Sequence, residues 1–404
     1  MDVIFVGRFI PERLLKTVVE DSHQKMGFSN HNFEMSIING LCLQQDVNVK
    51  CVSVPGVYSF PYNNKRLFTK SERYYYKNCK VSSVGFCNLP ILKEMISTIS
   101  LSVLLLKEIF LSKSEKVDVI VNTPNYWLLS AVRFSKLLTK KIITQTVIIP
   151  DIPVMVSSMD KHNYIKRILL NILHSCSMKK TSTSNGLVLL TEEMMDFINK
   201  PVRHIVMEGI VDVVTMDKME QSHDEQKKII LYTGTLREIF GVMNLVKAFK
   251  YVKDPDAELW LCGSGDSSSK IEAAARVDSR IKYWGLVDSK QALKMQRKAT
   301  ILVNPRTKEG EYTKYSFPSK TMEYLLSGKS VIINRLPGIP EEYYNYVYTP
   351  QDESVRSLAE CINAVLKMNP SERERKSLSG RQFVLLYKNS KIQTMRILDM
   401  IRQY

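Results

Sequence analysis

The chain has 404 residues, 44% of them hydrophobic, and its 57 Lys and Arg against 41 Asp and Glu give a formal net charge of +16. This length exceeds what one hydrophobic core usually covers, so two domains of about 200 residues each are expected. Its seven cysteines include no C-x-x-C pair, which excludes a zinc site built on such pairs and favours a reducing cytoplasm.

The N-terminal half predicts alternating strands and helices, because short apolar runs are separated by segments with helical periodicity. In chain order we expect a strand at 2–8, a helix from residue 30, strands at 47–54 and 81–86, a helix at 89–112, a strand at 117–124, a helix from residue 125 and a strand at 141–150. This order favours a mostly parallel sheet with helices on its faces. The connection at 8–29 is expected to be a long loop, and such loops are usually functional or mobile. His23 and His31 are interpreted as solvated side chains.

The most apolar stretch, residues 89–112, is interpreted as a helix that is well buried on the sheet. Lys93, Glu94, Lys107 and Glu108 interrupt it, so it falls short of the continuous run of about 20 apolar residues that spans a membrane. The run VIFV near the start is too short for a signal peptide.

A basic and aromatic segment at residues 63–80 stands out, with the sequence NNKRLFTKSERYYYKNCK. Amphipathic aromatic side chains among cations suit the interface of an anionic membrane. They also suit stacking on bases with neutralisation of phosphates, or a solvated loop. The residues in question are Lys65, Arg66, Lys70, Arg73, Lys77 and Lys80, interleaved with Phe68, Tyr74, Tyr75 and Tyr76.

The domain boundary is expected in the polar segment 212–226, which loses apolar periodicity, with domains at 1–211 and 227–388 and a terminal helix at 389–404. The second domain repeats strand, short loop and helix, which predicts a parallel sheet covered on both faces. Gly234, Gly263 and Gly265 follow strand ends, where they either allow a ligand to approach the backbone closely or form ordinary turns.

Residues 300–334 are the most informative segment, because they read as strand (300–303), polar loop, helix (317–326) and strand (330–333). Pro318 suits the first turn of that helix, and Gly328 suits its C-terminal end. In an open parallel sheet, the loop after a strand and the start of the next helix form the ligand edge, where a phosphorylated ligand binds. The polar side chains gathered there are Arg306, Glu309, Glu311, Lys314, Ser316, Ser319, Lys320 and Glu323.

The sequence FPSKTMEYLLSGKSVI is preceded by NPR at the strand end. Together these segments resemble the donor-binding signature of the family-4 glycosyltransferases of the GT-B class, especially enzymes that build bacterial surface polysaccharides such as capsule. The resemblance implies an α/β fold of two doubly wound, Rossmann-like domains that face a cleft. It also implies that the first domain holds the acceptor, that the second binds the nucleotide sugar, and that the terminal helix returns to the first domain.

In that family a helix carboxylate binds the ribose hydroxyls of the nucleotide, a role that falls on Glu323. The alternative is a solvated carboxylate with Lys320 as its i, i+3 partner. The family's second carboxylate, which contacts the donor sugar, is replaced by Tyr315 here. Either Glu309 or Glu311 takes over, or the sugar is recognised differently.

The family's usual diphosphate-binding Arg and Lys are replaced by Thr235 and Phe240. A leaving diphosphate needs charge compensation from fixed cations or helix termini, so Lys320 and Arg306 are the first candidates and Arg237 is the third. The remaining expected donor contacts are Ser316, Phe317, Ser319, Gly234, Thr235, Gly263, Gly265 and Glu311.

Asp151, Asp254 and Asp256 are further acidic residues to interpret. Asp151, in the PDIP sequence after the strand at 141–150, is an acceptor-side catalytic candidate or a turn former; many relatives place a His beside this acid, where this chain has Pro150. Asp254 and Asp256 form a D-x-D that precedes a strand, away from the ligand edge, and are interpreted as a turn. We expect neither metal nor cofactor.

By resemblance, the chain should transfer a sugar with retention from a nucleoside diphosphate sugar to a saccharide acceptor that we expect to be lipid-linked. The leaving phosphate oxygen would act as the base. Such an enzyme would work in the cytoplasm, peripherally on the inner face of the plasma membrane. The alternatives are a nucleotide-sugar epimerase of the same fold and a catalytically degenerate GT-B binding subunit. No recognised motif supports nucleic-acid binding.

Overall fold

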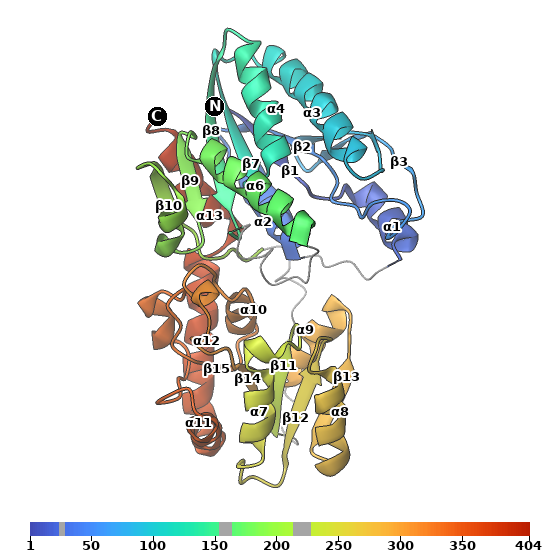
Figure 1. The fold of residues 1–404 in the computed structure, drawn as a ribbon. Coiled ribbons are helices and arrows are strands. Elements are labelled where there is room, and N and C mark those ends of the chain that lie inside the picture. Colours follow the sequence, from blue (N-terminus) through green and yellow to red (C-terminus); the bar gives the residue numbers. More distant parts are fainter. Residues whose placement is uncertain (24–28, 153–163, 213–227) are drawn as a thin grey trace. The chain divides into compact units, whose positions relative to one another are not determined.

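The computed structural model describes residues 1–23, 29–152, 164–212 and 228–404, which divide into two compact units (Figure 1). Met1–Asp212 and Ser390–Tyr404 form the N-terminal unit, and Val213–Asn389 form the C-terminal unit. Apart from Asp212, the expected linker at 212–226 lies outside the described residues. The two units are described separately.

The N-terminal unit is built on an eight-stranded sheet with the order β10-β9-β8-β7-β1-β2-β5-β4. All neighbouring pairs are parallel except the β4–β5 hairpin. Its central strands are continuous apolar runs, as strands covered on both faces must be. The bounds are β1 Asp2–Gly7, β2 Asn48–Ser53, β4 Glu72–Tyr76, β5 Cys79–Ser83, β7 Lys116–Asn122, β8 Ile142–Ile149, β9 Gly186–Leu189 and β10 Arg203–Val206, and a separate short pair joins β3 Phe68–Thr69 to β6 Phe86–Cys87.

Right-handed crossovers divide the helices of this unit between the two faces of the sheet. One face carries α3 (Leu92–Phe110), α4 (Tyr126–Leu137) and α6 (Tyr164–Thr181), where α4 contacts both of the others (Figure 1). The other face carries α2 (Ser29–Cys42) and the last helix, α13 (Ser390–Ile401), which pack closely. A side chain at Gly40 would bring its Cβ within 2.1 Å of the Ser390 carbonyl oxygen, so glycine is required at this crossing.

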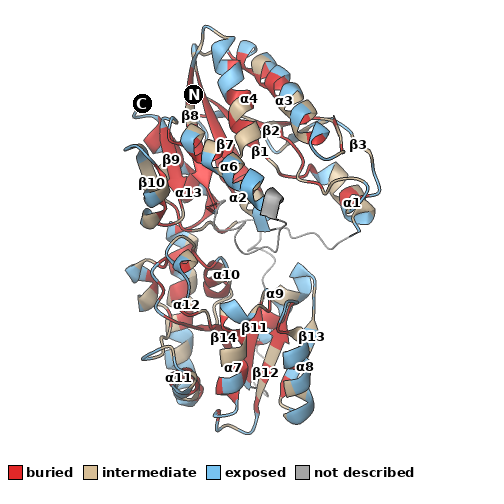
Figure 2. Ribbon diagram, viewed as in Figure 1, coloured by how far each residue is buried: buried red, intermediate tan, exposed pale blue. Residues whose placement is uncertain are grey.

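Three expectations for this unit need correction. The predicted loop 8–29 contains α1 (Glu12–Asp21), an amphipathic helix that buries only Val18. The segment 63–80 is not one solvated loop, because it forms β3 and β4, and the alternation of β4 directs Tyr74 and Tyr76 toward the core. Helix α3 is only half buried: Figure 2 shows exposed surface along it.

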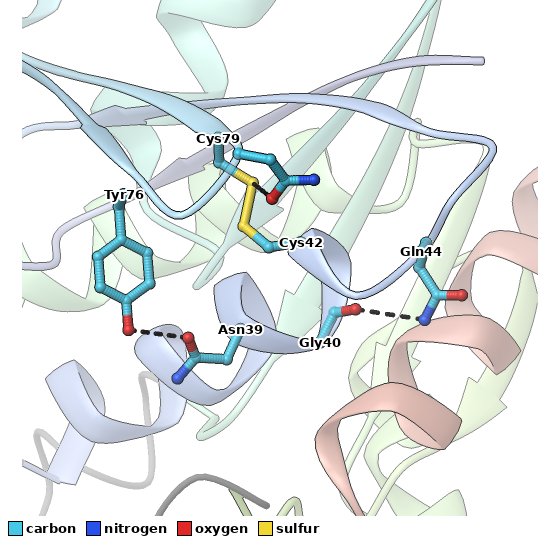
Figure 3. Close-up of a disulfide and its surroundings, with 7 residues drawn as sticks. Asn39, Gly40, Cys42, Gln44, Tyr76 and Cys79 are labelled. Carbon is cyan, nitrogen blue, oxygen red and sulfur yellow. Dashed lines mark hydrogen bonds between the residues drawn. A yellow bond between two sulfur atoms is a disulfide. The ribbon is translucent and has the colours of Figure 1, made fainter.

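A disulfide joins Cys42, at the end of α2, to Cys79, at the start of β5, with Cα atoms 6.1 Å apart (Figure 3). Beside it, the Tyr76 hydroxyl donates to Asn39 Oδ1 at 2.8 Å, and Gln44 Nε2 donates to the Gly40 carbonyl at 3.2 Å. Helix α2 is thereby fastened to the sheet. The cysteine pattern in the sequence favours a reducing cytoplasm, whereas this pair is joined as a disulfide.

The C-terminal unit contains a five-stranded parallel sheet with the order β13-β12-β11-β14-β15. Its strands are β11 Lys228–Thr233, β12 Ala257–Cys262, β13 Ile281–Gly285, β14 Ile301–Asn304 and β15 Ser330–Ile333. By crossover handedness, α7 (Val242–Phe249) and α8 (Ser268–Val277) cover one face, and α9 (Ser289–Lys298) and α10 (Lys320–Leu326) cover the other. Helices α11 (Val355–Lys367) and α12 (Pro370–Tyr387) complete the two layers, since α11 packs on α7 and α12 packs on α10.

Candidate functional site

The C-terminal sheet changes direction between β11 and β14. The chain runs from β11 outward to β12 and β13, then returns to β14 on the opposite side of β11. Ligands of open α/β sheets bind at the carboxyl ends of the strands at such a switch point. Here that edge is formed by Thr233 and Gly234 at the carboxyl end of β11, by Asn304 and Pro305 at the carboxyl end of β14, and by the start of α10.

Glu323, on α10, is held by donors from two helices. Gln296 on α9 donates from Nε2 to Glu323 Oε1, and Lys320 Nζ lies 2.7 Å from Glu323 Oε2. Gln296 is fully buried, and its Nε2 also donates to Thr233 Oγ1 at 2.9 Å. The side chain of Glu323 remains 31% exposed. It is therefore fixed in orientation while one side stays open to accept hydrogen bonds from a ligand.

Tyr324, the next residue, fastens α10 to the end of β11. Its hydroxyl accepts from the Thr233 N–H at 2.9 Å and donates to the Thr233 carbonyl at 3.2 Å. The residue is completely buried, and burial raises the pKa of its hydroxyl far above the ordinary value. Thr233, Gln296 and Tyr324 therefore position Glu323, and our sequence analysis identified none of them.

The expected diphosphate cations fall into two groups. The Arg306 guanidinium lies 4.6 Å from the ring centre of Phe240 and 5.5 Å from that of Tyr312, and its Nη1 is 3.5 Å from Ser316 Oγ. The Arg237 guanidinium lies 5.9 Å from the same Phe240 ring. Phe240, which replaces an expected cation, thus contacts two arginines. Lys320 is separate from this group and is paired with Glu323.

The glycine turns are explained by close packing of two loops. A Cβ on Gly263 would lie 1.8 Å from the Gly234 carbonyl oxygen, and one on Gly265 would lie 2.3 Å from the Leu236 carbonyl oxygen. The N–H groups of Gly234, Gly263 and Gly265 donate to Cys262, Gly285 and Ser268. Close packing therefore requires glycine at 263 and 265, and direct contact of these turns with a ligand stays a prediction.

The other expected donor contacts lie around the same edge with different exposure. Phe317 is buried and packs on Tyr343, with ring centres 5.3 Å apart, so its side chain belongs to the core. Ser316 and Tyr315 are half-buried, and Thr235, Glu311 and Ser319 are exposed. The Asp254 carboxylate pairs with Lys228, the first residue of β11, at 2.6 Å. The D-x-D therefore lies at the amino edge of the sheet, opposite the switch point.

The N-terminal unit also has polar side chains at its carboxyl edge. Asp151 is exposed just beyond β8. Glu34 is buried behind the loop after β1, where it accepts from the Arg8 N–H at 2.9 Å and from Asn122 Nδ2 at 2.7 Å. Burial raises the pKa of Glu34 from 4.5 to about 7. His31 is not simply solvated, because its Nδ1 accepts from the Ile10 N–H at 3.2 Å and burial lowers its pKa.

Comparisons with known proteins agree with this geometry. Residues 227–368, within the C-terminal unit, match the family model described as glycosyl transferases group 1. No curated protein matches the sequence. Solved structures match across both units, and the fold is GT-B, as predicted.

Three of these solved structures illustrate the likeness. Sucrose-phosphate synthase from Thermosynechococcus elongatus is 12% identical with a TM-score of 0.63, over 100% of this chain and 99% of that one. The E. coli structure titled trehalose-6-phosphate, bound with UDP-2-fluoro glucose, is 10% identical with a TM-score of 0.66 over the same shares. The lipopolysaccharide outer core galactosyltransferase WaaB is 12% identical with a TM-score of 0.59, also over 100% and 99%.

Proposed function

We propose that this protein is a glycosyltransferase that moves a sugar from a nucleoside diphosphate sugar to a saccharide acceptor. The observation that carries the proposal is the oriented carboxylate of Glu323 at the switch point of a glycosyltransferase group 1 domain. A carboxylate fixed by Gln296 and Lys320 can accept hydrogen bonds from both hydroxyls of a ribose. Charge-assisted hydrogen bonds of this kind are strong and geometrically specific.

The two arginines would serve the diphosphate. As the bond from the sugar to the diphosphate breaks, negative charge develops on the leaving phosphate, and preorganised cations stabilise it. Arg306 and Arg237 are held beside Phe240, so their positions are set before a ligand binds. Lys320 would contact the same phosphates, and it also pairs with Glu323 and so helps to orient that carboxylate. Transfer with retention, in which the leaving phosphate oxygen takes the acceptor proton, would need no protein nucleophile. Asp151 is the acceptor-side candidate.

The acceptor we propose is a lipid-linked saccharide used in cell-surface polysaccharide biosynthesis, with the protein peripheral on the inner face of the plasma membrane. The net charge of +16 supports contact with an anionic surface. A second candidate is a degenerate GT-B binding subunit, favoured by Tyr315, Thr235 and Phe240 at positions where the family has charged side chains. An epimerase of the same fold would convert the sugar of the donor while it stays linked to the nucleotide in the product, and it would need no acceptor.

A panel of UDP-, GDP- and dTDP-sugars distinguishes these candidates. For a transferase, nucleotide release from one donor should rise at least about tenfold when a suitable saccharide or lipid-linked saccharide is added. Conversion of the donor sugar without acceptor and without net release of nucleotide would indicate the epimerase. Binding of a nucleotide sugar with neither release nor conversion in any combination would indicate the binding subunit.

Transfer should proceed without a divalent metal. Arg306 and Arg237 can supply the charge compensation that a metal provides in other enzymes, and the D-x-D carboxylates lie at the opposite edge of the sheet, where Asp254 pairs with Lys228. We expect excess EDTA to change the initial rate of nucleotide release by less than about twofold. Loss of activity in EDTA and its recovery with Mn²⁺ or Mg²⁺ would contradict this.

A further inference from the structure

Helix α3 turns an apolar stripe toward solvent. Leu92, Met95, Ile99, Val103 and Phe110 follow one another at intervals of three, four or seven residues, so they lie on one side of the helix. They are between 45% and 64% exposed. Single exposed apolar residues are ordinary on a protein surface, but a contiguous apolar patch usually marks an interaction site.

The opposite side of α3, which faces the protein, holds charged groups that a surface helix would normally expose. Lys93 is buried and donates from Nζ to the Val57 carbonyl. Glu108 is buried and pairs with Lys80 at 2.6 Å and with Lys50 at 3.2 Å. These two charged residues are buried on α3 together with Leu101, Leu105 and Ile109, whereas the exposed side, apart from Lys107, is largely apolar. That outer side is suited to an apolar environment.

The apolar surface continues over the two neighbouring helices. Leu137 on α4 is 77% exposed, and Leu169 and Ile172 on α6 are 62% and 57% exposed. Helix α4 contacts both α3 and α6, and all three cover the same side of the sheet (Figures 1 and 2). We call the outer side of these three helices the helical face.

The Lys and Arg side chains of α4 and α6 make this part of the helical face positively charged. Over Tyr126–Leu137 and residues 167–181, where the side chains are described, these helices contain Arg133, Lys136, Arg167, Lys179 and Lys180, which makes five cations, and no Asp or Glu. Four of the cations, namely Arg133, Lys136, Arg167 and Lys179, are exposed. Apolar side chains beside exposed cations match the surface of a bilayer with anionic headgroups, where each cation near the surface contributes about 1 kcal/mol.

The basic segment 63–80 is a weaker match for the same partner. Arg66 is paired with Asp21 and Lys80 with Glu108, so both cations already have protein partners. Tyr74 and Tyr76 pack toward the core. Four cations, Lys65, Lys70, Arg73 and Lys77, are exposed as well, but the exposed apolar side chains of this segment are Phe68 and Tyr75, which is fewer than on the helical face.

We propose that the helical face docks this protein on an anionic lipid bilayer, with the apolar side chains of α3, α4 and α6 at the level of the headgroups and the cations on lipid phosphates. Within the described part of the chain, no helix is long and apolar enough to cross a membrane, so the helices would lie on the surface. Docking would bring the enzyme to a lipid-linked acceptor. In this respect alone the inference rests on the proposed function.

The test is sedimentation of the full chain with phosphatidylglycerol/phosphatidylcholine vesicles and with pure phosphatidylcholine vesicles. The variant Ile99→Gln/Val103→Gln/Phe110→Gln keeps good helix formers at exposed positions, so it should fold, which circular dichroism checks. Its affinity for the anionic vesicles should fall roughly a hundredfold, because the variant lacks three large apolar side chains whose transfer from water into the bilayer favours binding. A charge variant, Arg133→Gln/Lys136→Gln/Arg167→Gln/Lys179→Gln, should lose roughly a thousandfold. High salt should weaken wild-type binding.

The matched control is Lys65→Gln/Lys70→Gln/Arg73→Gln/Lys77→Gln, which removes the same number of cations from the segment 63–80. It should weaken vesicle binding by less than about threefold beyond the general loss of net charge. Unchanged binding by the apolar variant, or no vesicle binding by the wild type, would overturn the proposal. So would a dimer that the apolar variant dissociates and that binds no vesicles, since the face would then join two copies of the chain.

Nucleotide release with a water-soluble acceptor separates this inference from the proposed function. All three variants should release nucleotide at the wild-type rate, because none of the changed residues lies at the switch point. Normal release without vesicle binding would overturn the docking surface alone. Vesicle binding that the apolar variant loses, in a protein that releases no nucleotide, would leave the docking surface in place and overturn only the transferase.

Discussion

Replacing Glu323 with alanine is expected to weaken nucleoside diphosphate binding by roughly ten- to a hundredfold while the protein stays folded. A hydrogen bond to a charged group contributes about 1.5–3 kcal/mol, and each 1.4 kcal/mol corresponds to a factor of about ten. Glu323 is partly exposed and leaves no buried cation behind, since Lys320 is itself 34% exposed. Isothermal titration calorimetry with the nucleotide identified by the donor panel measures the change.

Two further variants make this result specific. Glu360→Ala removes an exposed helix carboxylate of the same unit and should leave the affinity unchanged. Gln296→Leu removes the buried amide that orients Glu323, and it should cause a smaller loss than Glu323→Ala. If Glu323→Ala binds the nucleotide as tightly as the wild type, then Glu323 is only the helix partner of Lys320, and the proposed ribose contact is wrong.

Much of the C-terminal fold could be predicted because local pattern and tertiary structure agree there. The apolar runs at β14 and β15 are buried strands, and Gly328 adopts φ +69° just past α10, where a left-handed residue ends a helix. The predicted start of that helix at residue 317, with Pro318 in its first turn, is wrong. The helix begins at Lys320, and Pro318 lies before it, with its carbonyl accepting from the Thr321 N–H at 2.8 Å.

The residues that complete the site could not be found by the same means. Gln296 lies 27 positions before Glu323, on a helix with a strongly polar sequence, and nothing in that helix distinguishes a buried glutamine from a solvated one. The Cys42–Cys79 pair, 37 residues apart, likewise depends on the crossing of α2 with the sheet. Such contacts between distant residues are decided by packing, which local periodicity does not record.

Helix α3 shows a second reason why the structure could not be predicted fully from the sequence. Its apolar content was interpreted as burial, yet Lys93 and Glu108 occupy the inner side and find partners in Val57, Lys50 and Lys80. The periodicity of a helix that is apolar almost all round does not reveal which side faces the sheet. The partners that neutralise Glu108 come from strands β2 and β5, more than 25 residues away in sequence.

The stability of the N-terminal unit is expected to fall as the pH rises from about 4.5 to 7, because of Glu34. Burial raises the pKa of this carboxyl to about 7 in the folded protein, from an ordinary value of 4.5. The folded state therefore keeps a proton that the unfolded state has lost, so the stabilisation present below pH 4.5 disappears by about pH 7. A difference of this size corresponds to about 3 kcal/mol. Glu34→Gln should remove this dependence.

The measurement is urea unfolding at pH 4.5 and pH 7.5 in a Trp260→Phe/Trp284→Phe background, where Trp127 alone reports the N-terminal unit, since the chain has three tryptophans. Relative to this background, Glu34→Gln should gain about 3 kcal/mol between the two pH values. Glu108→Gln is the control of opposite sign. Burial alone would raise the pKa of Glu108, but hydrogen bonds from Lys80 and Lys50 outweigh it and lower that pKa. Glu108→Gln should therefore cost most at pH 7.5. Parallel pH dependence in Glu34→Gln and the background would mean that Glu34 is ionised in the folded protein at pH 4.5.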